Sequence, residues 1–305
     1  MRKGLYILML IVGMIACQHN IVSTDPTLKL AFSHDTVSFD TVFTEMGSST
    51  KCVMIYNPNK NAINIDQVSM REGKYFHINL DGESNRDKLQ DITVCGGDSL
   101  FLFVRTYIDP LDENSPVLID DEIALGVNGN TQTIKLQAYG QNVERIRSDS
   151  GLVVFQDLTL SNKKPYVLYD TVAVAGNLTI EAGATIYMHA GAMLYAYGNV
   201  TAKGSKEQPI IFRGDRTDML FDSVPYRMAS GQWDGIYLIH PEGSLPPTYT
   251  LDNVHVLSGS VGLYVYSEAT GIKLPSLTLK NSRIHNHSVY GLVLQNVDAT
   301  VANCE

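Results

Sequence analysis

Apolar and polar residues alternate in short runs along most of the chain, which is typical of β-strands because successive strand side chains face opposite sides of a sheet. Ile134, Leu136 and Ala138 alternate with polar neighbours, whereas the run 99–104 is almost continuously apolar. After the first sixteen residues, no long stretch has the apolar spacing of an amphipathic helix. We therefore expect an all-β fold.

Residues 27–142 and 171–305 differ in how their runs are organised. In the first range, short strands and turn residues alternate at the spacing typical of an antiparallel β-sandwich. In the second range, motifs repeat: Gly176-Asn177 recurs as Gly198-Asn199, 22 residues later. Two further series of repeats are Gly235, Gly262 and Gly291, and Asn253, Asn281 and Asn303.

Three motifs that recur with a similar step indicate one coil per step, with several short strands in each coil. Stacked coils bury an apolar face that one coil cannot bury alone. The repeats therefore predict a parallel β-helix. Asn253, Asn281 and Asn303 would occupy one turn position, where stacked Asn side chains form a structural ladder along the axis.

The N-terminus has the plan of a signal peptide, residues 1–16. Arg2 and Lys3 precede an apolar run over residues 5–15, and Ala16 and Cys17 follow. The run is too short for a comfortable transmembrane span, which needs about 20 residues. We expect this segment to be removed.

Met14-Ile15-Ala16-Cys17 resembles the bacterial lipobox. The resemblance implies lipidation of Cys17, with residues 17–26 as a tether and the membrane as a partner through the lipid. It places the protein in the cell envelope as an outer-membrane lipoprotein, either surface-exposed or periplasmic. An ordinary secretory signal with a coincidental Cys is the alternative interpretation.

Four segments of the first range, 39–43, 53–57, 97–100 and 137–140, resemble the Ig-like domains of the abnormal-spindle and hydin type. Such domains occur in many envelope lipoproteins, including those of Bacteroidetes. The resemblance implies a spacer or interaction module without catalytic residues over residues 27–142. We assign residues 143–170 to a linker and an N-terminal cap for the coils.

The second range resembles pectin-lyase-like right-handed parallel β-helices in residues 177–186, 209–212 and 232–236. This implies that fold over residues 171–305. It does not imply an activity, because the fold hosts lyases, hydrolases, adhesins and spacers. Because residue 305 falls inside a coil, we expect further coils and a cap beyond it.

The formal charge of −9 disfavours nucleic acid as a partner. No cysteine pair has the spacing of a zinc site, so we expect no metal site. A Cys52–Cys95 disulfide is compatible with an oxidising envelope but is not required.

Charged residues gather in the longest insertion of the second range, after the strand at Phe212. Weak candidates for catalysis there are Asp215, Asp218, Asp222 and Arg227. Grouped carboxylates could bind Ca²⁺ or act as acid and base on a glycan. A solvated charged loop is the simpler interpretation.

Aromatic residues at strand positions are the candidates for ligand binding: Trp233, Tyr237, Tyr264 and Tyr266. If they share an outer face they could stack on sugar rings, although packing around Trp233 is the plainer explanation. His285 and His287 would share a face of a strand, and we expect a solvent-facing pair there because no third ligand lies nearby.

The favoured hypothesis is a non-enzymatic, membrane-anchored envelope lipoprotein without a cofactor, whose β-helix presents a surface for glycan or protein binding. The alternative is a polysaccharide lyase or glycoside hydrolase of the pectin-lyase-like fold that acts on acidic glycan and uses Ca²⁺. Grouping of Asp215, Asp218 and Asp222 around one cleft would favour the enzyme.

Overall fold

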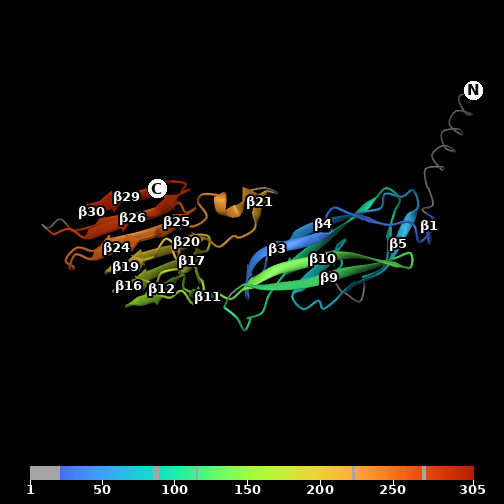
Figure 1. Cartoon of the computed structure of the whole chain (residues 1–305), viewed down its shortest axis with the longest axis horizontal. Coiled ribbons are helices and arrows are strands. Elements are labelled where there is room, and N and C mark those ends of the chain that lie inside the picture. Colours follow the sequence, from blue (N-terminus) through green and yellow to red (C-terminus); the bar gives the residue numbers. More distant parts are fainter. Residues whose placement is uncertain (1–20, 85–88, 115, 222–223, 270–272) are drawn as a thin grey trace, which may run out of the picture. The chain divides into compact units, whose positions relative to one another are not determined.

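The computed structural model describes residues 21–84, 89–114, 116–221, 224–269 and 273–305. These residues form an all-β structure (Figure 1) with one 3₁₀ turn, η2 (Tyr226–Met228). None of their helical segments is long and apolar enough to cross a membrane. The predicted signal peptide and Cys17 lie outside the described residues.

The chain divides into two compact units. The first unit contains most of the chain before residue 139. The second contains residues 139–305 together with residues 40–45 and 109–117.

Two sheets form the framework of the first unit. The six-stranded sheet has the order β1-β5-β9-β10-β3, and β7 also pairs with β5. Its strands are β1 (Val22–Ser23), β3 (Thr36–Phe43), β5 (Ala62–Met70), β7 (Gln90–Val94), β9 (Val117–Val127) and β10 (Asn130–Gln141). The four-stranded sheet consists, in spatial order, of β2 (Ala31–Phe32), β4 (Lys51–Tyr56), β8 (Ser99–Thr106) and β6 (Phe76–Leu80).

Alternation along each strand explains the core of this unit. Phe39 of β3 meets Phe76 of β6 with 6.1 Å between ring centroids, which brings the two sheets into contact. In β8, Leu102 and Val104 are fully buried, while Phe101 and Phe103 face outward and are exposed. Complete burial of one such side chain contributes about 1.5–3 kcal/mol. The apolar run 99–104 is thus a central strand with one open face.

The two described cysteines of the first unit, Cys52 and Cys95, are not bridged. Cys52, on β4, is exposed, and both it and Cys95 are free thiols, as is Cys304 in the second unit.

Three parallel six-stranded sheets form the second unit, which is consistent with a parallel β-helix. The first coil sheet consists of β11 (Glu144–Ile146), β14 (Tyr166–Leu168), β17 (Thr185–Met188), β20 (Ile210–Gly214), β25 (Val254–Leu257) and β28 (Arg283–His285). The second consists of β12 (Leu152–Phe155), β15 (Thr171–Val174), β18 (Met193–Ala196), β23 (Gly235–His240), β26 (Val261–Ser267) and β29 (Tyr290–Gln295). The third consists of β13 (Leu158–Leu160), β16 (Leu178–Ile180), β19 (Val200–Lys203), β24 (Thr248–Asp252), β27 (Ser276–Lys280) and β30 (Asp298–Ala302).

Each coil contributes one strand to each sheet, so inward side chains stack in rows. Leu194 of β18 lies in register between Val172 of β15 and Ile236 of β23, and all three are buried. The outer face of the third sheet instead has Thr at one position in every coil.

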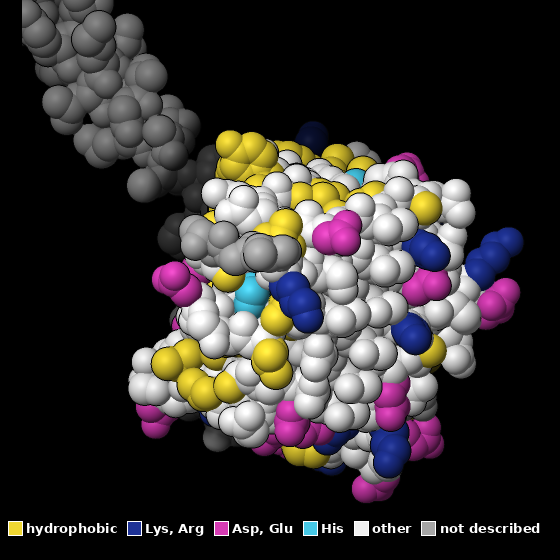
Figure 2. Space-filling view, turned by 90° about the vertical axis from the view of Figure 1, so that its left-hand side faces the viewer, with side chains coloured by type: hydrophobic (Ala, Val, Ile, Leu, Met, Phe, Trp, Pro, Cys, Tyr) yellow, Lys and Arg dark blue, Asp and Glu magenta, His cyan; other side chains and the backbone are white. Residues whose placement is uncertain are grey.

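In the last coil, several apolar side chains are exposed to solvent. Val289, Tyr290, Leu294 and Val301 are exposed by 39–60%. Figure 2 shows hydrophobic side chains along its upper edge, where the last coil lies in Figure 1.

Coil strands begin earlier than we predicted. β11, β12 and β13 lie within residues 143–170, the segment assigned to a linker and cap, and they pair in parallel with β14, β15 and β16. This segment therefore contains the first coil and the first strand of the second coil, β14. The first coil lacks the Gly-Asn motif that precedes β16 and β19, and short runs of apolar residues indicate its strands in the sequence.

Asn253, Asn281 and Asn303 occupy one turn position, with φ of 51°, 49° and 55°. This left-handed conformation favours Asn over most other residues. Asn303 donates to Asn281 Oδ1 at 3.2 Å, but Asn281 donates to Asp252 Oδ1 at 2.9 Å instead of to Asn253. The Asn253 side-chain amide also donates a hydrogen bond to Asp252 Oδ1. The ladder therefore runs through the Asp252 carboxylate.

Candidate functional site

Five tyrosines lie on the outer face of the second coil sheet, and we call them the tyrosine face. Tyr195, Tyr237 and Tyr264 occupy the same register position in β18, β23 and β26. Tyr197 and Tyr266 lie two residues further along their coils. The residues between these tyrosines point into the core, because strand side chains alternate.

The rings form one continuous group. Tyr195 stacks on Tyr237 with 4.8 Å between centroids and 15° between planes, and on Tyr197 with 6.3 Å and 11°. Tyr264 extends the group, with 5.9 Å to Tyr237 and 6.3 Å to Tyr266. Offset aromatic contacts of this kind stabilise the arrangement, so the rings are held in place before any ligand arrives.

Two hydroxyls of the tyrosine face, those of Tyr195 and Tyr237, remain protonated at neutral pH. Burial raises the pKa of Tyr195 and of Tyr237, and neighbouring tyrosines and the carboxylate of Asp234 raise both further. Tyr264 donates its hydroxyl proton to Gln295 Oε1 at 3.2 Å. The face therefore combines half-buried rings, hydroxyl groups and one nearby carboxylate.

Such a surface suits a ligand with apolar faces and hydroxyl edges. Tyrosine offers an apolar ring and a polar tip, and the Asp234 carboxylate can accept hydrogen bonds. A sugar ring has C–H groups on its faces and hydroxyl groups on its edge. The carboxylate would repel an anionic sugar, so the chemistry favours a neutral glycan.

Trp233 does not belong to this face, although the sequence had suggested it. It is 1% exposed, and its indole N–H donates to the Leu257 carbonyl at 2.9 Å. A Cβ added at Gly259 would lie 3.0 Å from the indole, so this glycine leaves room for the ring. Trp233 is a packing residue. Tyr195 and Tyr197 were missed in its place.

The acidic candidates have separate partners. Asp215 is 10% exposed at its side chain and lies 2.6 Å from His189 Nδ1. Asp218 forms a two-point ion pair with Arg216, at 2.8 and 2.6 Å. Arg227 is exposed, and its carbonyl accepts a hydrogen bond from Ser258.

Asp222 lies outside the described residues. In the described part of the chain, no three His, Cys, Asp or Glu residues gather closely enough to hold a metal ion. Asp215 and Asp218 pair with different residues, His189 and Arg216. The grouping of all three carboxylates around one cleft, which would favour the enzyme, stays a prediction.

His189 was not recognised from the sequence. It directly follows β17, and Asp215 directly follows β20, the next strand of the same sheet. Tyr169 occupies the equivalent position after β14, and its ring centroid lies 4.6 Å from that of His189. Burial raises the pKa of Tyr169, and Asp215 adds to the shift. Alignment of the coils would have revealed this column.

His285 and His287 do not form the solvent-facing pair that we expected. Asn286 between them has φ of 64°, which breaks the strand alternation. His285 is exposed, whereas His287 packs edge-on against Trp233 at 6.4 Å and contacts the Val256 carbonyl through Nε2 at 3.1 Å. His287 is therefore part of the packing around Trp233.

Comparisons with known proteins give no family. No protein-family model and no curated protein matches the chain. A protein of unknown function from Porphyromonas gingivalis is 14% identical, with a TM-score of 0.28, over 39% of this chain and 52% of that chain.

Two other solved structures are similarly distant. A family 123 glycoside hydrolase from Clostridium perfringens is 8% identical, with a TM-score of 0.29, over 39% of this chain and 30% of its own. The ASH/PapD-like domain of human CEP192 is 10% identical, with a TM-score of 0.26, over 41% of this chain and 94% of its own. The match thus spans about half of the Porphyromonas protein and less of the hydrolase. At these TM-scores the similarities support no statement about fold or function.

Proposed function

We propose that this protein is a membrane-anchored lipoprotein of the cell envelope that binds neutral glycans on its tyrosine face. The second unit is a right-handed parallel β-helix of the pectin-lyase-like kind in this proposal, and the first is an Ig-like spacer. The lipid anchor rests on the sequence around Cys17.

The observation that supports glycan binding most strongly is the in-register group of Tyr195, Tyr237 and Tyr264 on three successive coils. Strands in one sheet lie about 4.8 Å apart, so these rings form a strip along the coil axis. An extended glycan chain can contact several tyrosines at once, and contacts in series add affinity without a deep pocket.

A glycan array tests this proposal with the full chain in mild detergent. We expect binding to neutral oligosaccharides and loss of most of that binding in Tyr237→Leu, which keeps an apolar side chain but removes the ring and hydroxyl. Tyr139→Leu is the matched control, since Tyr139 is 45% exposed and lies outside the tyrosine face. Equal binding by both variants and the unaltered protein would contradict the proposal.

The contact between Asp215 and His189 favours a second candidate, a lyase or hydrolase for acidic glycan. An Asp that orients a His is a common arrangement for acid and base chemistry. This candidate predicts release of unsaturated or reducing ends from acidic polysaccharides, and loss of that activity in Asp215→Asn. Absence of activity in the unaltered protein, with and without added Ca²⁺, would reject it.

A further inference from the structure

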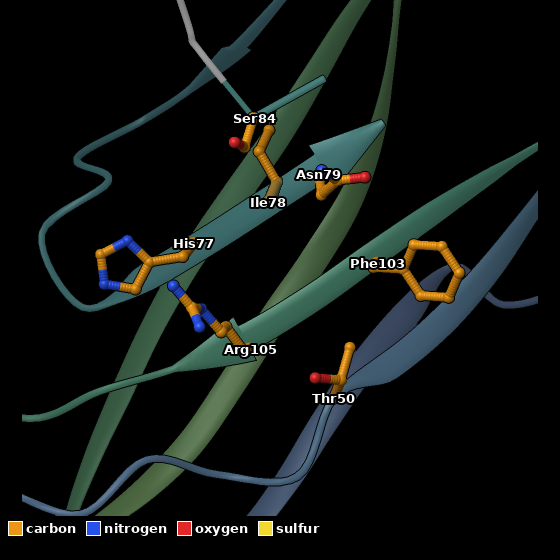
Figure 3. Close-up of a pocket in the computed structure, with 7 residues that line it drawn as sticks. All are labelled: Thr50, His77, Ile78, Asn79, Ser84, Phe103 and Arg105. Carbon is orange, nitrogen blue, oxygen red and sulfur yellow. The ribbon is translucent and has the colours of Figure 1, made fainter. Parts of the chain in front are cut away.

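The outer face of the four-stranded sheet in the first unit contains an open hollow of about 550 Å³. Five residues that line it bear on its chemistry: Thr50, His77, Asn79, Phe103 and Arg105. Figure 3 shows His77 and Arg105 close together on β6 and β8, with Phe103 further along β8 and Thr50 below them. The volume lies within the range of small-molecule sites, about 300–1,000 Å³.

Strand register explains why these side chains meet. His77 pairs with Arg105 and Asn79 pairs with Phe103 in the antiparallel ladder of β6 and β8. On the other side of β8, Lys51 pairs with Val104, so Thr50 lies next to Arg105. The hollow therefore has a polar, cationic row beside a row that contains an aromatic ring.

Arg105 differs from the arginines of the chain that pair with a carboxylate. Arg71, Arg216 and Arg283 each pair with a carboxylate. Among the residues that the structure describes, none forms an ion pair or hydrogen bond with the Arg105 guanidinium. In a chain with a formal charge of −9, this exposed guanidinium is available to bind an anion. Its planar group can donate two parallel hydrogen bonds to a carboxylate or a sulfate.

Phe103 supplies the apolar part of the site. Its side chain is 39% exposed, and its ring is nearly parallel to that of Phe101, with 6.0 Å between centroids and 8° between planes. Phe103 lies two residues before Arg105 in β8, so both side chains are on the same face of the sheet. Two residues of a strand span about 7 Å, so a ligand must present an anionic group and an apolar face at about that separation.

We propose that this hollow binds a sugar bearing an anionic group, a carboxylate or a sulfate. Arg105 binds the anionic group, Phe103 contacts the C–H face of the ring, and Asn79 and Thr50 bind hydroxyl groups. The site belongs to the first unit and is independent of glycan binding on the tyrosine face. It would give the expected spacer a binding role of its own.

Calorimetric titration of the full chain in mild detergent tests this site. The probes are digalacturonate, a sulfated galactobiose and the neutral galactobiose. The variants are Arg105→Gln, which removes the charge, and Phe103→Leu, which removes the ring. Arg71→Gln is the control, because Arg71 is a half-exposed arginine of the same unit that pairs with Asp120.

We expect one or both anionic probes to bind at least tenfold more tightly than neutral galactobiose. Loss of a hydrogen bond to a charged group reduces affinity by about 10- to 100-fold, so Arg105→Gln should bind the anionic probe at least tenfold more weakly. Phe103→Leu should weaken binding of the same probe, while Arg71→Gln and Tyr237→Leu leave it unchanged. A preference for digalacturonate or for the sulfated probe identifies the anionic group.

Three results would overturn this proposal: no binding of either anionic probe, equal binding of the neutral probe, or unchanged affinity in Arg105→Gln. Because Tyr237→Leu tests the other unit, failure here leaves the tyrosine face unaffected, and failure there leaves the hollow unaffected. Arg105 and Phe103 are exposed, so substitution of either should leave the unit folded, which circular dichroism verifies.

Discussion

Replacement of Leu194 by Ala should strongly destabilise the second unit. Leu194 is fully buried on the inner side of β18, and its neighbours in register are Val172 and Ile236 of the adjacent coils. Loss of a buried Leu side chain costs about 2–5 kcal/mol, more where the surroundings cannot close the cavity. Backbone hydrogen bonds to β15 and β23 fix the spacing of the coils, so we expect about 3–5 kcal/mol.

Urea denaturation followed by tryptophan fluorescence measures this loss. The chain has one Trp, Trp233, and it is buried in the second unit, so the signal follows that unit. For a urea dependence of about 1–3 kcal/mol per molar, the midpoint should fall by about 1 M or more.

Thr201→Ala is the control for Leu194→Ala. Thr201 is exposed on the outer face of β19, in the column of Thr residues. Its replacement should cost less than about 1 kcal/mol, because surface substitutions in strands have small effects. If Leu194→Ala shifted the midpoint no more than Thr201→Ala, the inward rows would not be the source of stability.

Three further predictions concern the same unit and use the same urea assay. Tyr249→Phe should leave stability unchanged or raise it by about 1 kcal/mol, because the buried Tyr249 hydroxyl has no hydrogen-bond partner among the described residues; a clear loss would contradict this. Asn281→Ala should cost about 1–2 kcal/mol while Asn281→Gly costs less, because φ is 49° there; equal losses would contradict the conformational argument. Burial lowers the pKa of His287 from 6.5, so the unfolded chain binds a proton at a higher pH than the folded chain does. Stability should therefore fall as pH drops below about 6.5. His287→Gln should make that fall shallower, and an unchanged pH profile would contradict this prediction.

The repeats were sufficient to predict the register of the later coils. Leu178 pairs with Val200, as the repeat from Gly176 to Gly198 predicts. Leu263 pairs with Leu292, as the repeat from Gly262 to Gly291 predicts. A solenoid repeats its turn chemistry where its backbone repeats, so glycines and asparagines at corners reveal the register. The all-β prediction is also confirmed. Alternation of apolar and polar residues predicted strands correctly because alternate strand side chains are buried and exposed.

The candidate site was harder to predict because the insertion interrupts the repeat. Tyr195 and Tyr237 are 42 residues apart in sequence, nearly twice the step of 22 between earlier coils, although they stack in space. His189 and Asp215 were missed as a pair because each lies at a corner, just after its strand. Trp233 was misplaced because an aromatic residue next to a strand can face inward or outward, and local sequence does not distinguish the two.

Ultraviolet difference spectroscopy of the tyrosines during glycan titration tests the central claim most directly. A neutral oligosaccharide that binds on the tyrosine face should change the tyrosine absorbance with a saturable dependence on concentration. Replacement of Tyr195, Tyr237 and Tyr264 together by Leu should abolish that change, whereas Tyr139→Leu should preserve it. A saturable change that persists in the triple variant would show that the glycan binds elsewhere.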